Sequence, residues 1–315
     1  MCSSNIEKPM DETLTFFSPD TLVHIGLPKA ASTSLQQHYF QILPHINYVG
    51  RNSIKGEAFE HGIKDCLFKN GRVTPVETGL VADYLSADQY NVISNEGLSS
   101  GLGGTLWYHR AQLLKEMIGP NCCVLIVIRN PLTYVKSWFG EYTKNSFSDD
   151  RPVLNFDKWF ELKISQESSE ERRRLLFADL AVSYTHAFGR ANVEVLPFEY
   201  LQNDYHKFFK KINQLSENRL GPPPVIFTQK LNPAISNGRY LYLKFRQQRN
   251  LWSKALGYTC RALGTFAPYF SKPFLVNLSA AQKQMLIELT RDQCQWISTE
   301  WDLNLEKYDY PSRGS

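Results

Sequence analysis

The chain has 315 residues, of which 43% are hydrophobic, 13% aromatic and 21% charged, and its formal net charge is +4. Its ordinary glycine and proline content excludes collagen-like and wholly disordered classes. No apolar run approaches the ~20 residues that span a bilayer, and we expect no secretory signal in the acidic, proline-containing residues 1–20.

The sequence predicts strands that alternate with helices. Short apolar or β-branched runs predict strands at Thr21–Gly26, Tyr90–Asn95, Cys122–Arg129 and Asn192–Phe198. Helical patterns lie at Ser32–Leu43, Thr105–Ile118, Pro131–Lys144, Leu175–Phe188, Tyr200–Gln214, Ser236–Gln247 and Ala280–Ser298. This alternation predicts an α/β fold with a mainly parallel sheet. We expect an N-terminal arm over 1–20 and one domain over 21–315, divided by prolines 222–224 into an α/β core (21–217) and a basic helical extension (218–315).

Basic residues are unevenly distributed along the chain. Residues 218–287 contain ten bases and no acid, whereas the rest of the chain holds 25 bases and 31 acids. This split predicts that the C-terminal third faces an anionic partner. The alternative is a solvated basic surface that pairs with acids elsewhere in the fold.

The six cysteines show no CxxC spacing, and Cys122 and Cys123 are adjacent in an apolar run. Successive side chains of a strand face opposite ways. We therefore expect reduced, buried thiols rather than disulfides, which is typical of a cytoplasmic protein.

The junction between the first strand and the first helix is typical of an anion site. Its candidate residues are Pro28, Lys29, Ala31, Ser32, Thr33 and Ser34. The first N–H groups of a helix lack backbone partners and carry partial positive charge, so they bind anions. Lys29 adds a full charge. Alternatively, Ser32 or Thr33 only caps the helix. The spacing does not fit a Walker A loop, in which the lysine immediately precedes the helix-starting hydroxyl.

A second strand-to-helix junction carries Arg129 and Ser137. Arg129 ends a predicted strand, where open parallel sheets bind ligands, and Ser137 follows two helical turns later. An arginine and a hydroxyl in this arrangement can hold one phosphate. The alternative for Arg129 is a salt bridge at the end of the strand.

These motifs resemble those of sulfotransferases that use PAPS (3′-phosphoadenosine 5′-phosphosulfate). The loop Leu27–Leu35 resembles their 5′-phosphosulfate loop, although Ala31 stands where the family usually has glycine. Arg129–Pro131 with Ser137 resembles their 3′-phosphate site, and Pro197–Leu201, which includes Phe198, is similar to a motif near the adenine. The resemblance covers residues 22–205 and implies a P-loop-like three-layer fold. The loop form looks most like bacterial and carbohydrate-type members.

The resemblance implies transfer of a sulfuryl group from PAPS to a hydroxyl or amine, without a metal. Lys29 matches the family lysine that approaches the bridging oxygen. A carbohydrate or glycoconjugate acceptor is the expectation. The acceptor also needs a general base. Our first candidate for this base is Glu96, and the alternative is that Glu96 only caps or braces its loop. His109 is the second candidate, and His24 is the third.

The basic C-terminal third contains two further candidate regions. Lys230 and Arg239 flank a turn-rich segment that we expect to close over the 3′-phosphate. Residues 251–270 mix aromatic and basic residues, which predicts a packed helical lid, peripheral contact with an anionic membrane, or a site for a lipid-linked glycan. Two other functions stay open: a phosphotransferase that uses Mg-ATP, and a non-catalytic module that binds nucleotides or polyanions. No nucleic-acid-binding motif is present.

Overall fold

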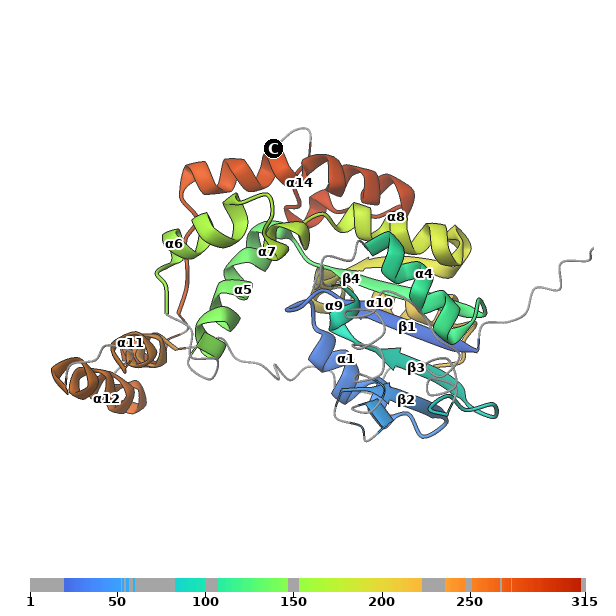
Figure 1. The fold of residues 1–315 in the computed structure, drawn as a ribbon, viewed down its shortest axis with the longest axis horizontal. Coiled ribbons are helices and arrows are strands. Elements are labelled where there is room, and N and C mark those ends of the chain that lie inside the picture. The colour runs from blue at the N-terminus through green and yellow to red at the C-terminus, as the bar shows by residue number, and fades with distance from the viewer. Residues whose placement is uncertain are drawn as a thin grey trace, which may run out of the picture.

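The structure, a computed structural model, describes residues 20–51, 53, 55, 56, 59, 83–99, 107–146, 153–222, 236–246, 251–266, 268–272 and 274–312. Within these residues, five parallel strands form one sheet in the order β2-β3-β1-β4-β5 (Figure 1). The strands are β1 (Thr21–Gly26), β2 (Ile46–Gly50), β3 (Tyr90–Ser94), β4 (Cys122–Ile128) and β5 (Val193–Pro197).

The α-helices are α1 (Ser32–His38), α4 (Trp107–Ile118), α5 (Pro131–Ser146), α6 (Phe156–Phe160), α7 (Glu170–Arg173), α8 (Phe177–Phe188), α9 (Phe198–Asn203), α10 (Tyr205–Leu215), α11 (Asn237–Arg246), α12 (Leu251–Phe266), α13 (Pro268–Ser271) and α14 (Ala280–Glu300). Shorter turns lie at η1 (Phe40–Ile42), η3 (Glu96–Ser99), η5 (Glu161–Ser165), η6 (Arg190–Asn192) and η7 (Glu306–Tyr308). No helix in the described parts of the chain is both long and apolar enough to cross a bilayer.

Strand β1 is the centre of the sheet. It pairs with β3 on one side and with β4 on the other, and every residue of these three strands is buried. Such complete burial requires helices on both faces, as continuous apolar parallel strands predict. The chain places β2 and β3 on one side of β1 before it crosses to β4 and β5. Ligands of open α/β sheets bind beyond the carboxyl ends of strands at such a reversal.

Helices cover the sheet in two layers. Helix α8 packs on β4 and β5, with α4 beside it and α14 outside it (Figure 1). Helix α10 also packs on β4 and β5, and its Phe209 ring lies 4.6 Å from that of Tyr39, at the end of α1. The predicted α/β fold with a parallel sheet is therefore confirmed.

The structure corrects several predicted boundaries. The last three predicted strands each end one residue earlier, because Asn95, Arg129 and Phe198 belong to the turns or helices that follow. Helix α1 ends at His38 rather than Leu43. The predicted helix Tyr200–Gln214 is two helices that separate at Asp204, whose side chain accepts a hydrogen bond from the Lys207 N–H and starts α10.

The C-terminal third joins the fold in two different ways. Helix α14 contributes Leu286, Cys294 and Ile297 to the main core, whereas Tyr242 and Leu243 of α11 form a small separate cluster. The four described cysteines are free and buried, which confirms the expectation for Cys122 and Cys123. The predicted arm over 1–20, apart from Asp20, and candidate Lys230 lie outside the described residues.

Candidate nucleotide and acceptor site

The loop between β1 and α1 is a tight turn with an unusual backbone. Lys29 and Ala31 adopt left-handed conformations, with φ of 68° and 66°. This conformation costs a residue with a Cβ about 1 kcal/mol, and such strain is concentrated at functional sites. Ala31 therefore adopts the geometry that favours glycine, and Ser32–Ser34 follow as the first turn of α1.

Gly26 allows this turn to close. A Cβ at Gly26 would lie 2.1 Å from the Ser32 hydroxyl oxygen, so a larger residue would displace the Ser32 side chain from the first turn of α1. The Leu27 N–H donates to the Val127 carbonyl of β4 at 3.1 Å. The loop is thus held at the carboxyl edge of the sheet, as the sequence predicts.

Lys29 points toward helix α5. Its Nζ lies 3.2 Å from Oε2 of Glu141, and their side chains are 21% and 30% exposed. Partial burial alone would raise the pKa of the Glu141 carboxyl, but the charge and hydrogen bond of Lys29 hold that pKa below its ordinary value. Glu141 lies 112 residues from Lys29, so no local motif in the sequence links the two.

Arg129 meets the Lys29 loop directly. One guanidinium nitrogen donates to the Lys29 carbonyl at 2.7 Å, and Nε donates to the Thr133 hydroxyl at 3.1 Å. The guanidinium carbon lies 4.9 Å from the ring centroid of Phe198. Burial lowers the pKa of Arg129, while nearby Glu199 favours its charged form. The two predicted anion-binding junctions therefore lie side by side.

Helix α5 places a third predicted residue between these two contacts. Thr133 bonds Arg129, and Glu141 pairs with Lys29. Ser137 is four residues from each of them, and side chains four residues apart share one face of a helix. Half-buried Ser137 therefore lies on the face of α5 that contacts both cationic residues.

A buried polar network fixes Arg129 and the start of α5. The Asn130 side-chain oxygen accepts from the Leu132 N–H at 2.9 Å, and its backbone N–H donates to Oε1 of Glu199 at 3.1 Å. Oε2 of Glu199 accepts from the Tyr310 hydroxyl at 2.7 Å. The Asn130 amide also donates to the carbonyls of Tyr308 and Asp309. No local sequence signal indicates this network, because Glu199 and Tyr310 are 111 residues apart.

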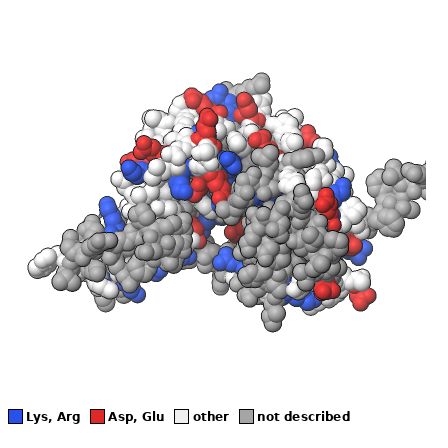
Figure 2. Space-filling model, viewed as in Figure 1, with Lys and Arg blue, Asp and Glu red and all other residues white. Residues whose placement is uncertain are grey.

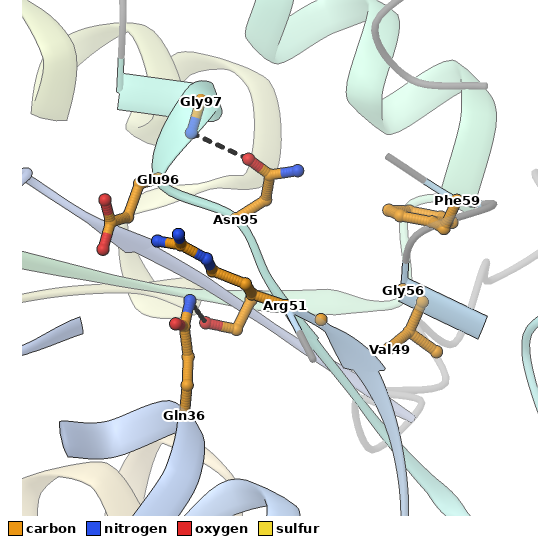
Figure 3. A pocket seen from close by; sticks show the side chains of 10 residues that line it. Gln36, Val49, Arg51, Gly56, Phe59, Asn95, Glu96 and Gly97 are labelled. Carbon is orange, nitrogen blue, oxygen red and sulfur yellow. Dashed lines mark hydrogen bonds between the residues drawn. The ribbon is translucent and has the colours of Figure 1, made fainter. Parts of the chain in front are cut away.

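Glu96 follows β3 and lies beside a cavity of about 300 Å³. Gln36, Arg51, Ser94 and Glu96 are among the lining residues, and the Arg51 guanidinium points toward the Glu96 carboxylate (Figure 3). Burial raises the pKa of Glu96, and the opposing effects of Arg51, a hydrogen bond from Ser32 and the Lys29 charge do not cancel that rise. The cavity therefore adjoins the Lys29 loop on the β2–β3 side of the sheet, opposite Arg129.

The two histidine candidates are placed differently from Glu96. His24 is fully buried within β1, where its Nδ1 lies 2.7 Å from the Ser94 hydroxyl, and burial lowers its pKa to about 3. It is therefore a neutral core residue. His109 is exposed in the first turn of α4 and does not line the cavity. Among the described residues, no group of three or more His, Cys, Asp or Glu is positioned to hold a metal ion.

Comparisons with known proteins give only remote likenesses. No family model matches the chain, and no curated protein matches it. A sulfotransferase from Alicyclobacillus acidocaldarius is 17% identical with a TM-score of 0.47, over 68% of this chain and 87% of the other. The sulfotransferase domain of the Synechococcus PCC 7002 olefin synthase is 13% identical with a TM-score of 0.33, over 87% and 94%. Mouse sulfotransferase SULT7A1, solved with PAP (the bis-phosphorylated nucleotide), is 12% identical with a TM-score of 0.33, over 91% and 82%. Likenesses this remote assign no activity, which has to be argued from the site.

Proposed function

We propose that this chain is a sulfotransferase that transfers a sulfuryl group from PAPS to a hydroxyl or amine of a carbohydrate or glycoconjugate. The observation that carries the proposal is the 2.7 Å hydrogen bond between the Arg129 guanidinium and the Lys29 carbonyl. It brings two loops, 100 residues apart in the chain, to one edge of the sheet. One ligand with anionic groups at both ends can then contact both loops.

The residues at this edge fit such a ligand. Lys29, Ser32, Thr33 and Ser34 offer an ammonium, hydroxyls and backbone N–H groups for the phosphosulfate end, with Pro28 and Ala31 shaping the loop. Arg129 and Ser137 offer donors for the 3′-phosphate, as an arginine fork and a hydroxyl do for phosphates elsewhere. The Phe198 ring beside Arg129 offers an apolar surface for the adenine.

Two side chains account for the transfer itself. The Lys29 ammonium stabilises negative charge that develops on the leaving phosphate oxygen as its bond to sulfur breaks, and this interaction strengthens in the transition state. Glu96 accepts the proton that the acceptor loses as the new bond to sulfur forms. A carboxylate with a raised pKa is well matched to that role, because its basicity lies closer to neutral pH. We propose that Lys29 and Arg129 supply the positive charge and that no metal is required.

The cavity beside Glu96 supports a polar acceptor. The Arg51 guanidinium and the side-chain oxygen of Gln36, whose amide nitrogen donates to the Ser94 hydroxyl at 3.0 Å, are polar groups of its lining that can hydrogen-bond sugar hydroxyls. A small phenol, in contrast, needs a mainly apolar pocket. In an acceptor screen we expect oligosaccharides to react faster than simple phenols; the reverse order would reject the carbohydrate assignment.

The first test is ligand-dependent stability. A ligand that binds the folded state raises the melting temperature by mass action, so we expect stabilisation by PAP without metal. Stabilisation by ATP with Mg²⁺ and not by PAP would reject the proposal in favour of a phosphotransferase. Binding of PAP without turnover of any acceptor would indicate a nucleotide-binding module.

The second test is turnover of labelled PAPS by variants of Lys29. Lys29→Ala should lower kcat at least about 100-fold, the effect of losing one donor to a developing oxyanion. Lys158→Ala, which removes an exposed lysine of α6, serves as the matched control and should keep full activity. Undiminished turnover by Lys29→Ala would remove Lys29 from the mechanism.

A further inference from the structure

Helices α11, α12 and α13 form a hairpin that lies to one side of the sheet (Figure 1). Helix α12 packs on α11 and α13. A Cβ at Gly238 of α11 would lie 2.8 Å from the Cys260 carbonyl of α12, so the two helices approach closely. The Arg261 guanidinium of α12 lies 5.3 Å from the Tyr242 ring centroid. One side of α12 is therefore committed to the hairpin.

The opposite side of α12 is apolar and exposed. Trp252, Leu256 and Tyr258 are 87%, 49% and 53% exposed. Ala255, Thr259 and Ala262 complete the described part of this side, and the Thr259 hydroxyl donates to the Ala255 carbonyl at 3.0 Å. With 3.6 residues per turn, these positions share one half of the helix. Tyr258 lies at the edge of this half, where its ring is 5.5 Å from that of Tyr242 of α11. We call these six residues the outer face of α12.

The hairpin that carries this outer face is basic. Arg239 and Lys244 of α11, Arg261 of α12 and Lys272 are all exposed. They belong to the 70-residue segment 218–287, which contains no acid. Figure 2 shows Lys and Arg, and no described Asp or Glu, around the hairpin on the face in view. An apolar helix face with flanking bases and no acids is complementary to a negatively charged apolar boundary.

We propose that the outer face of α12 docks on an anionic lipid bilayer, with the helix lying in the plane of the interface. The helix has 16 residues and is about 24 Å long, so its outer face can enter the headgroup boundary along its whole length. The exposed bases of the hairpin add electrostatic attraction to an anionic leaflet. A soluble polyanion such as heparin would use the bases but would not need an exposed tryptophan. The inference does not rest on the proposed reaction.

The test is flotation of the full chain with phosphatidylcholine vesicles, with and without phosphatidylglycerol. We expect flotation only with the anionic vesicles, and less of it at high salt. Trp252→Ser with Leu256→Ser should weaken binding at least about tenfold, because two apolar side chains are then lost from the part of the helix that enters the bilayer. The control, Ile42→Ser with Val182→Ser, removes two exposed aliphatic residues from η1 and α8, respectively, and should bind normally.

Fluorescence provides a second readout. The difference in emission between the unmodified chain and Trp252→Phe reports Trp252 alone, and brominated lipid should quench it. Absence of flotation, flotation unchanged by the double variant, or binding of heparin but not of vesicles would each overturn the proposal. So would a concentration-dependent dimer in which Trp252 is shielded without lipid, because a second copy would then cover the outer face.

Discussion

Replacement of Glu141 by glutamine should strengthen the binding of PAP. Lys29 and Glu141 are 3.2 Å apart, which corresponds to about 5 kcal/mol of attraction at an effective dielectric constant of ~20. Both side chains are partly exposed, and measured pairs of this kind contribute about 1 kcal/mol or less. A phosphate that binds Lys29 has to replace that interaction and also lies near the Glu141 charge. We therefore expect Glu141→Gln to lower the Kd of PAP about fivefold.

Titration calorimetry at several salt concentrations measures this change, and the gain should shrink as salt screens the pair. Glu194→Gln is the matched control, because it removes a similar ion pair, 3.0 Å long, between β5 and Lys211 of α10. It should leave PAP affinity unchanged. Weaker binding by Glu141→Gln would refute the reasoning, because it would mean that Glu141 positions Lys29 instead of competing with the ligand.

Three further variants test other parts of the structure. Glu96→Gln should abolish the acid limb of the pH–rate profile, and in the unmodified chain that limb should lie above the ordinary pKa of a glutamate. Ionisation of the buried Glu96 destabilises the fold. The unmodified chain should therefore lose stability relative to Glu96→Gln as pH rises through the raised pKa of Glu96. Gly26→Ala should weaken PAP binding while the chain stays folded, because its methyl group displaces the Ser32 side chain, and circular dichroism with titration checks both. Tyr310→Phe should cost about 1–3 kcal/mol in urea unfolding, since Glu199 loses a buried donor; an unchanged midpoint would contradict the bond.

The strands of the sheet could be predicted where an uninterrupted run of apolar residues indicates a strand. Strands β1 and β4 are continuous apolar runs, and both were found. Strand β2 was missed because two of its five residues, Asn47 and Gly50, are of types that are unfavourable in strands. Asn47 is nevertheless buried, and its amide donates to the Tyr84 carbonyl at 2.7 Å and to the Asn91 side chain at 2.8 Å. Those partners exist only in the folded chain.

The site was predictable in the same local sense. Lys29 and Arg129 could be identified because each lies in a strand-to-helix junction whose chemistry can be read from adjacent residues. Arg51 was missed together with β2, which it directly follows. Glu141 could not be found, because only the packing of α5 against the loop brings it to Lys29. Local motifs thus predict the donors of the site, whereas tertiary contacts determine which acids modulate them.

The contacts of Asn130 impose an order on the assembly of the site. Its side-chain amide donates to the carbonyls of Tyr308 and Asp309, which follow Asn130 by 178 and 179 positions in the chain. The five strands of the described sheet all precede residue 198, so the sheet and the Lys29 loop can form while later residues are still being synthesised. The anchor beside Arg129 closes only after residue 310 has left the ribosome. A nascent chain therefore forms the sheet early and completes the anion site of Lys29 and Arg129 last.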